Sequence, residues 1–240
     1  MEVSQNKPVE IEISSASVFY GKERILENLN LLIKEQRVGF IGRNGSGKTT
    51  LLRILAGLQE LHNGKVLIDG TEVAKKRNEA IRKVGIIFQN PDHQIIFPTV
   101  GEELRFGLTQ LGLKRNEADL KVIACLKEYD KVNWFERSIS TLSQGQKHLV
   151  CLLSILLMKP MVLLLDEPFT GIDIPTQRKL ERYLGSLKQT IIHVSHVPET
   201  FENYQRLIWM DEGVVKADGS PKTVTKKYKD AMNNYNEKNI

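Results

Sequence analysis

The stretch "RVGFIGRNGSGKTTLLRIL", from Arg37 to Leu55, decides the fold of this chain. Its apolar start is typical of a buried strand, and Leu51, Leu52, Leu55 and, just beyond the stretch, Leu58 are expected on one face of a helix. Between them, "GRNGSGKT" fits the pattern G-x-x-x-x-G-K-[ST], a loop whose glycines let successive backbone N–H groups face an anion. The helix start adds partial positive charge, and Lys48 adds a full charge. The stretch therefore predicts a phosphate-binding loop between a strand and a helix.

This predicted loop supplies most of the candidate ligand contacts. The Thr49 hydroxyl is expected to complete the shell of a Mg²⁺ ion that bridges terminal phosphates. A glycine turn that only caps a helix is the alternative, and the complete motif between a strand and a helix argues against it. The residues expected to contact the phosphates are Gly42, Asn44, Gly45, Ser46, Gly47, Lys48, Thr49 and Thr50.

A second apolar strand, "MVLLLDEP", ends in two acids. A buried strand of this kind delivers Asp166 to the carboxyl edge of a parallel sheet, where the carboxylate is expected to hold Mg²⁺ directly or through water. Glu167 points to the other side and is expected to orient and deprotonate the water that attacks the phosphate. The alternative is that both acids only cap the strand.

The remaining pattern predicts one α/β domain over residues 1–240. Apolar strands such as "MVLLLDE" and "TIIHVSH" alternate with helices, which favours a mostly parallel sheet covered on both faces. We expect a core at about 1–91 and 159–225, a helical part at about 92–158, and a C-terminal tail at about 226–240. The stretch "RLIWMDEGVVKADG" predicts a hairpin that turns at Glu212 and Gly213.

Composition limits the possible roles. The hydrophobic fraction of 41% supports a sizeable core, and the net charge of +5 is expected to reflect a solvated basic surface rather than nucleic-acid binding. Cys125 and Cys151 lie in apolar surroundings, which predicts free buried thiols in a reducing compartment. No uncharged apolar run reaches the length that crosses a bilayer, so a role at a membrane requires another chain as an anchor.

Three further motifs follow the phosphate loop. These are Gln89 after an apolar strand, "LSQGQ" from Leu142 to Gln146, and His196 after "IIHVS". Their order around "LLLDEP" resembles that of ATP-binding cassette (ABC) ATPases, and the resemblance extends from Val9 to about Gly219. It implies an ABC nucleotide-binding domain that binds ATP and Mg²⁺, with a RecA-like, mostly parallel sheet core, an N-terminal antiparallel β part and a helical insert.

The resemblance implies that "LSQGQ" completes the site of a second ATPase chain, either a copy of this chain or a paralogue. Ser143 offers a hydroxyl to the γ-phosphate, Gly145 permits close backbone approach, and the helix start directs N–H groups at the anion. Gln146 belongs to the same motif, and Gln144 stands where a glycine is commoner. An ordinary capping box between Ser143 and Gln146 is the alternative interpretation.

Other roles follow from the same resemblance. Tyr20 is expected to stack on adenine, and Asp173 to lie in a loop that crosses the dimer interface. His196 is expected to contact the γ-phosphate, although "SHV" replaces the commoner T-H-D. The implied catalytic set is Glu167, His196 and Gln89, and the implied metal set is Thr49, Gln89 and Asp166. His62, His148 and His193 are expected to be structural.

The segment "FQNPDHQIIFPTVGEELRFGL" resembles ATPases of energy-coupling factor importers. It implies a transmembrane coupling subunit that meets Asp92 and the apolar run Ile95 to Phe97, a substrate-binding membrane subunit, and a peripheral position on the cytoplasmic face of the cell membrane. The amino-acid sequence of this segment is most similar to that of biotin-importer ATPases. Alternatives are a loop that folds on its own core, the ATPase of another importer or exporter, or a nucleic-acid- or ribosome-associated ABC ATPase. No nucleic-acid partner is expected.

Overall fold

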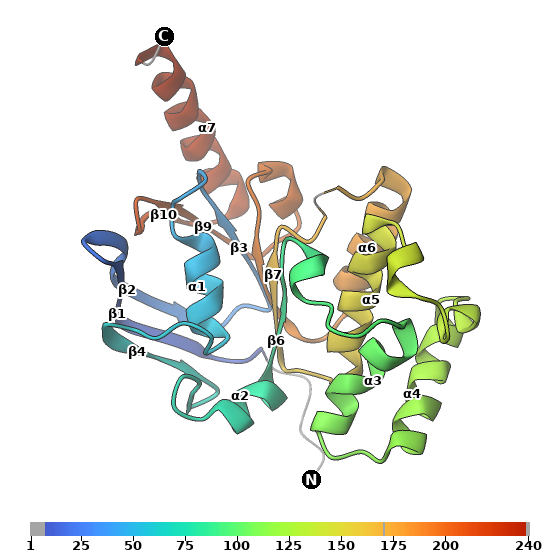
Figure 1. The fold of residues 1–240 in the computed structure, drawn as a ribbon. Helices are drawn as coiled ribbons and strands as arrows, with labels where there is room; N and C mark the ends of the chain where they lie inside the picture. Colours follow the sequence, from blue (N-terminus) through green and yellow to red (C-terminus); the bar gives the residue numbers. More distant parts are fainter. Residues whose placement is uncertain (1–7, 170, 239–240) are drawn as a thin grey trace. The chain divides into compact units, whose positions relative to one another are not determined.

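A computed structural model describes residues 8–169 and 171–238. The chain forms two compact units, and Figure 1 shows its helices and strands. The first unit contains Met1–Val84, Met161–Glu167 and Lys188–Ile240, and the second contains Gly85–Pro160 and Pro168–Leu187. The sequence motifs therefore divide between two separately packed bodies.

The first unit begins with a four-stranded antiparallel sheet. Its strand order is β2-β1-β4-β5, with β1 at Ile11–Tyr20, β2 at Glu23–Ile33, β4 at Asn63–Ile68 and β5 at Thr71–Glu72. Every neighbouring pair in it is antiparallel. Ile11 and Ile13 alternate with less buried residues, as expected for a strand with one face on the core. The predicted antiparallel β part is thus confirmed.

The second sheet holds the parallel core. Its order is β10-β9-β3-β8-β7-β6, with β3 at Arg37–Ile41, β6 at Val84–Ile87, β7 at Val162–Asp166, β8 at Thr190–Val194, β9 at Arg206–Asp211 and β10 at Val214–Gly219. β3 runs parallel to β8 and β9, and β7 runs parallel to β8. Every residue of β7 and β8 is buried, which explains why most of their residues are apolar.

The hairpin of β9 and β10 turns where the sequence predicted. Glu212 and Gly213 both have positive φ, 48° and 76°. Two consecutive residues in the left-handed region match the right-handed twist of the flanking strands, and this makes a two-residue connection possible. β10 therefore continues the sheet as an antiparallel edge.

Helices of the first unit are α1 at Lys48–Leu55, α2 at Arg77–Lys83, the short 3₁₀ helix η4 at Pro198–Phe201, and α7 at Pro221–Lys238. In α1, Leu51, Leu52 and Leu55 are buried as predicted, whereas Leu58 is exposed. The prediction that Leu58 shares this helical face is wrong because α1 ends earlier: Gly57 has a φ of 69°, which helices do not continue through.

The chain end that was predicted to be a tail forms most of α7, drawn in red in Figure 1. Val224 and Tyr228 are buried in a cluster with Phe201 and Leu207, and Met232 packs against it. Their spacing of four places them on one face of a helix, so packing stabilises a segment that its many lysines made look fully solvated. The tail prediction is therefore wrong for the described part of this segment.

The second unit is helical. It contains α3 at Val100–Gln110, α4 at Arg115–Glu128, α5 at Gln144–Leu157, α6 at Ile174–Ser186, and 3₁₀ helices η1 at Pro91–His93, η2 at Val132–Trp134 and η3 at Ile139–Thr141. Its core joins one face of each of three helices, with Leu104 from α3, Val122 from α4 and Leu153 from α5 all fully buried. Helices α3, α4 and α5 lie in the part expected to be helical at about 92–158. By contrast, α6 was expected in the core and belongs to this unit instead, because its Tyr183 packs against the helical core.

No helix in the described part of the chain is long and apolar enough to span a membrane. Both cysteines are free, with Cys151 buried and Cys125 partly buried. Burial raises the pKa of the Cys125 thiol to about 11 and that of Cys151 to about 12. The thiols are therefore protonated near neutral pH, so the reactive thiolate form is scarce.

Candidate functional site

The phosphate loop owes its shape to its glycines. Gly45 and Gly47 have φ values of 81° and 95°, a backbone region that other residues enter at a cost. A Cβ on Gly42 would lie 2.1 Å from the carbonyl oxygen of Met210, and one on Gly47 would lie 2.8 Å from that of Ile25. At either position a side chain would collide with these carbonyl oxygens. The shape of the loop therefore requires glycine at both positions.

Lys48 lies inside this loop. Its Nζ donates hydrogen bonds to the carbonyl oxygens of Gly42 at 2.8 Å and Arg43 at 2.7 Å, and to Ser46 Oγ at 3.2 Å. Burial lowers the pKa of the Lys48 ammonium, and the charges of Glu167, Asp166 and Asp211 oppose that shift. The loop thus holds a cation at its centre.

The start of α1 adds to this positive site. Gly47 is the N-cap, and no side chain caps the helix. The first N–H groups of a helix lack carbonyl partners within it and carry partial positive charge. Asn44 and Thr49 are exposed on the loop, whereas Ser46 and Thr50 are buried. A phosphate group fits this combination of free N–H groups and an ammonium.

Asp166 and Thr49 meet at the end of β7. A hydrogen bond from Thr49 lowers the pKa of the Asp166 carboxyl, but burial is the larger effect, and the pKa is raised overall. Glu167 also raises the pKa, whereas Lys48 and Arg53 lower it. A buried carboxylate beside a hydroxyl is a set of hard oxygen donors that suits Mg²⁺. The two residues fit the predicted metal role.

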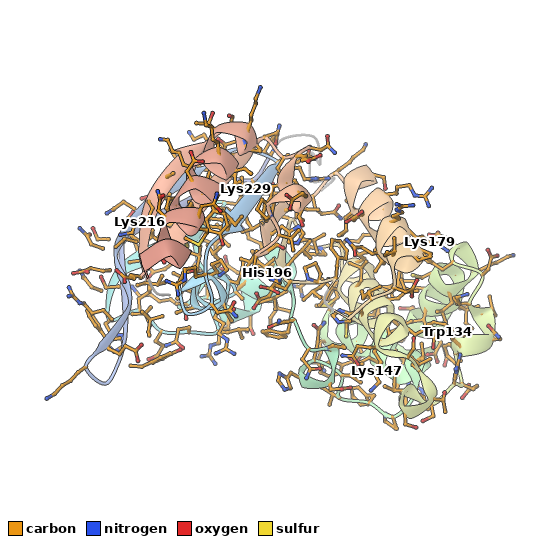
Figure 2. The ribbon with its side chains drawn as sticks, turned by 90° about the horizontal axis from the view of Figure 1, so that it is seen from above. Trp134, Lys147, Lys179, His196, Lys216 and Lys229 are labelled. Carbon is orange, nitrogen blue, oxygen red and sulfur yellow. The ribbon has the colours of Figure 1, made fainter. Side chains whose placement is uncertain are left out.

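Glu167 and His196 are brought together across the end of β7. His196 Nδ1 lies 2.9 Å from Glu167 Oε2. The Glu167 side chain is 11% exposed and that of His196 is 56% exposed, so the pair bridges the interior and solvent. Glu167 has a φ of 45°, an unusual value for a residue with a side chain, while its N–H donates to the Val194 carbonyl. Two predicted catalytic residues are therefore in direct contact, and His196 is labelled in Figure 2.

Tyr20 ends β1 with an accessible ring. Its side chain is 47% exposed, and its hydroxyl donates to Gln59 Oε1 at 3.1 Å. An exposed aromatic face held at its hydroxyl end is suited to stacking on a base. Adenine stacking by Tyr20 stays a prediction.

The second unit holds the "LSQGQ" motif at the start of α5. Ser143 Oγ accepts from the Gln146 N–H at 3.3 Å, and Gln146 Oε1 accepts from the Ser143 N–H at 3.0 Å, which is a capping box. The alternative interpretation of this stretch is therefore correct as local structure. It is compatible with phosphate binding, because an accepting hydroxyl still has its own proton to donate.

Two other predicted residues belong to the second unit. Gln89 follows β6, and Asp173 directly precedes α6. The sequence also placed Asp92 against a membrane partner, whereas its carboxylate pairs with Lys147 of α5 at 2.7 Å. Asp92 is half exposed in this pair, and Lys147 is labelled in Figure 2.

The sequence analysis missed Asp211. Its charge raises the pKa of Lys48, although it lies far from the phosphate loop in the sequence. Asp211 is the last residue of β9, which pairs with β3, the strand that leads into the loop. The signal was available: "LIWMD" is an apolar run that ends in an acid, as "VLLLD" is.

Comparisons with known proteins identify the family of this chain. Residues 26–170 match the ABC transporter family. The biotin transport ATP-binding protein BioM of Rhodobacter capsulatus is 43% identical over 222 residues, which cover 92% of this chain and 95% of that protein. The energy-coupling factor transporter ATP-binding protein EcfA1 of Ligilactobacillus salivarius is 33% identical, over 93% of this chain and 82% of that protein.

Among solved structures, cbiO1 of Clostridium perfringens, described as part of the ABC transporter complex cbiONQ, superposes with a TM-score of 0.77. It is 28% identical, and the match covers 93% of this chain and 92% of that one. The family match spans more than half of the chain and includes the phosphate loop and Asp166. The roles of the Lys48 loop, the Thr49–Asp166 pair and the Glu167–His196 pair in ATP binding stay predictions, and the chain is a member of the ABC transporter ATPases.

Proposed function

We propose that this chain is the ATP-hydrolysing subunit of an energy-coupling factor importer. The observation that carries the proposal is the contact between Glu167 and His196 at 2.9 Å, beside a buried Asp166 and a loop built around Lys48. This arrangement unites a general base, a polar residue near the γ-phosphate and a phosphate cradle. A domain that only binds nucleotide needs no general base.

In the proposed reaction, Glu167 takes a proton from the water that attacks the γ-phosphate. A positioned general base contributes about 10²–10⁴-fold to a rate. His196 holds the Glu167 carboxylate in place and contacts the γ-phosphate, while Lys48 and the N–H groups of α1 stabilise the negative charge that develops on the phosphate oxygens. Thr49, Asp166 and Gln89 would hold Mg²⁺, which supplies charge neutralisation on the phosphates.

A second chain completes the site in this proposal. Ser143, Gly145 and Gln146 contact the nucleotide held by the partner's phosphate loop, and Asp173 lies at the same interface. Support comes from the α5 N-terminus, where the Ser143 hydroxyl keeps a proton for an acceptor while it caps the helix. ATP binding closes the two chains and hydrolysis opens them, so that the nucleotide shifts a population between two states.

The membrane partner docks on residues 90–97, which we name the docking segment. The Ile96 side chain in it is 69% exposed. The position of the complete ATPase is then peripheral, on the cytoplasmic face of the membrane, bound to a transmembrane coupling subunit and a substrate-binding subunit. The similarity to BioM supports biotin as the cargo within the wider class of vitamins and metal ions.

The proposal is tested by purifying the tagged chain from membranes in mild detergent, identifying the integral proteins bound to it, and reconstituting the complex into vesicles. We expect ATP-dependent accumulation of labelled biotin, and no accumulation when Glu167→Gln replaces the native chain. Stable purification without any integral membrane protein contradicts the importer assignment. Accumulation of another vitamin or of a metal ion corrects the cargo alone.

A further inference from the structure

Glu103 is a buried acid that the catalytic site does not use. It lies in the first turn of α3 and is only 5% exposed. Its Oε2 accepts hydrogen bonds from the backbone N–H groups of Ile96 at 2.9 Å and Phe97 at 3.0 Å. One carboxylate oxygen therefore holds two consecutive peptide groups of the docking segment.

These two peptide groups belong to no helix or strand. Upstream of them, the Ile95 N–H donates to the Pro91 carbonyl at 2.9 Å, and the Asn90 side chain caps η1. The backbone of Ile96 and Phe97 instead depends on a side chain from α3. A charged acceptor makes stronger hydrogen bonds than a neutral one, which suits a segment without a ladder of its own.

In the same segment, successive side chains have different surroundings. Ile95 packs against the helical core, and the Phe97 ring contacts Phe106 with centroids 5.1 Å apart. Ile96, between them, faces solvent. A core contact at Ile95, a ring contact at Phe97 and a fixed backbone between them hold the exposed Ile96 side chain outward.

We propose that Glu103 is a positioning residue that fixes the docking segment so that Ile96 is presented to the apolar surface of the transmembrane partner. This inference rests on the proposed function for the identity of the partner. It assigns to Glu103 a role in coupling rather than in ATP chemistry. Pre-ordering the segment removes the entropy cost of ordering it on binding.

The neighbouring Glu102 provides a matched control. Its carboxylate accepts from Thr99 Oγ1 at 2.7 Å at the start of α3, whereas the N–H groups of Ile96 and Phe97 donate to Glu103. Glu103→Gln and Glu102→Gln are the same chemical change at adjacent positions. Both variants keep an oxygen acceptor and the shape of the side chain, so both are expected to fold.

Amide hydrogen exchange tests the positioning directly. In Glu103→Gln we expect the Ile96 and Phe97 amides to exchange about tenfold faster, because the charged acceptor is lost, while amides of α4 and α5 are unchanged. Glu102→Gln leaves these two amides as in the native chain. Equal exchange at Ile96 and Phe97 in all three proteins overturns the inference, whatever docks on the segment.

A nitroxide probe provides a second readout. Ile96→Cys is the site for labelling, since burial raises the pKa of the two native thiols to about 11 and about 12 and leaves their reactive thiolate form scarce near neutral pH. We expect a more mobile spectrum when Glu103→Gln is added and no change with Glu102→Gln. Glu103→Asp, whose carboxylate is one methylene shorter, is expected to give the mobile spectrum as well. An unchanged spectrum in both Glu103 variants contradicts the inference.

Retention of the membrane partner separates the inference from the proposed function. Detergent extracts of cells with each tagged variant are compared for the amount of integral subunit retained. Reduced retention for Ile96→Glu and Glu103→Gln, but not for Glu102→Gln, supports both the docking of the membrane partner on this segment and the positioning role of Glu103. Reduced retention for Ile96→Glu alone overturns the role of Glu103 and leaves the docking site standing. Full retention for Ile96→Glu overturns docking at this segment, even where exchange shows that Glu103 orders it.

Discussion

Single residues of this ATPase carry their roles through the neighbours that the fold gives them. Glu167 is one of two adjacent acids, and their neighbours differ: Asp166 contacts Thr49, and Glu167 contacts His196. Glu167 has a φ of 45°, which is unusual for a residue with a side chain. The proposed division of labour, with Asp166 at the metal and Glu167 at the attacking water, is consistent with these different neighbours.

Glu167→Gln is expected to lower ATP turnover by about 10²–10⁴-fold, because the amide cannot accept a proton from water. ATP affinity is expected to stay close to that of the native chain, since the phosphate loop is unaltered. Phosphate release and nucleotide titration measure the two quantities. Glu212→Gln is the control, an exposed glutamate that also has positive φ. Native turnover in Glu167→Gln contradicts the role of the base.

His193 links stability to pH. It is fully buried in β8, and burial lowers its pKa to about 3. In the unfolded chain its pKa is near 6.5, so below that pH the unfolded state binds a proton that the native state does not. Stability is therefore expected to fall by up to about 1.4 kcal/mol per pH unit as pH decreases from 6.5 toward 3.

Urea unfolding at pH 7, 6 and 5 measures this dependence. His193→Gln is expected to show a shallower decline in the free energy of unfolding, whatever its stability at pH 7. The exposed His93, replaced by Gln, is the control and is expected to keep the native slope. If the free energy of unfolding declines equally with pH in the native chain and in His193→Gln, His193 is not the residue that links stability to pH.

At the scale of elements, α5 combines a structural and a functional requirement in one residue. Its capping box makes Ser143 a helix N-cap, while the proposed function makes it a phosphate donor. Replacing a serine N-cap by alanine costs about 1 kcal/mol, so a loss of activity in that variant does not separate the two roles.

Ser143→Asp separates them. Aspartate is as good an N-cap as serine, so the thermal midpoint is expected to stay near that of the native chain. A negative charge against the γ-phosphate is expected to abolish hydrolysis, although the chain's own phosphate loop still binds ATP. Calorimetry, nucleotide titration and phosphate release test these three points. Full hydrolysis by Ser143→Asp contradicts phosphate binding at Ser143.

At the scale of the whole molecule, the candidate residues fall into the two compact units. Tyr20, the phosphate loop, Asp166, Glu167 and His196 belong to the first, whereas Gln89 and the Ser143 motif belong to the second. Because the proposed site needs two chains, the hydrolysis rate per chain is expected to depend on the protein concentration.

Dilution tests this pairing. The hydrolysis rate per chain is expected to fall when the protein is diluted below the dissociation constant of the dimer, because each site needs a partner's Ser143. Light scattering on the same samples reports the mass of the particles. A constant rate in samples that contain only single chains contradicts the shared site.

The sequence by itself determined most strands and helices and the order of the motifs that mark the family. The glycine loop, the two acids after an apolar strand and the hairpin at Glu212 all depend on neighbours in the chain, and local patterns predict such features. Only the tertiary structure decided the contacts between distant residues, such as His196 with Glu167 and Glu103 with Ile96. It also converted a lysine-rich tail into α7, because Val224 and Tyr228 find a core to bury in. The physical reason is that burial and hydrogen bonding depend on what lies opposite a residue, and the sequence order does not state that.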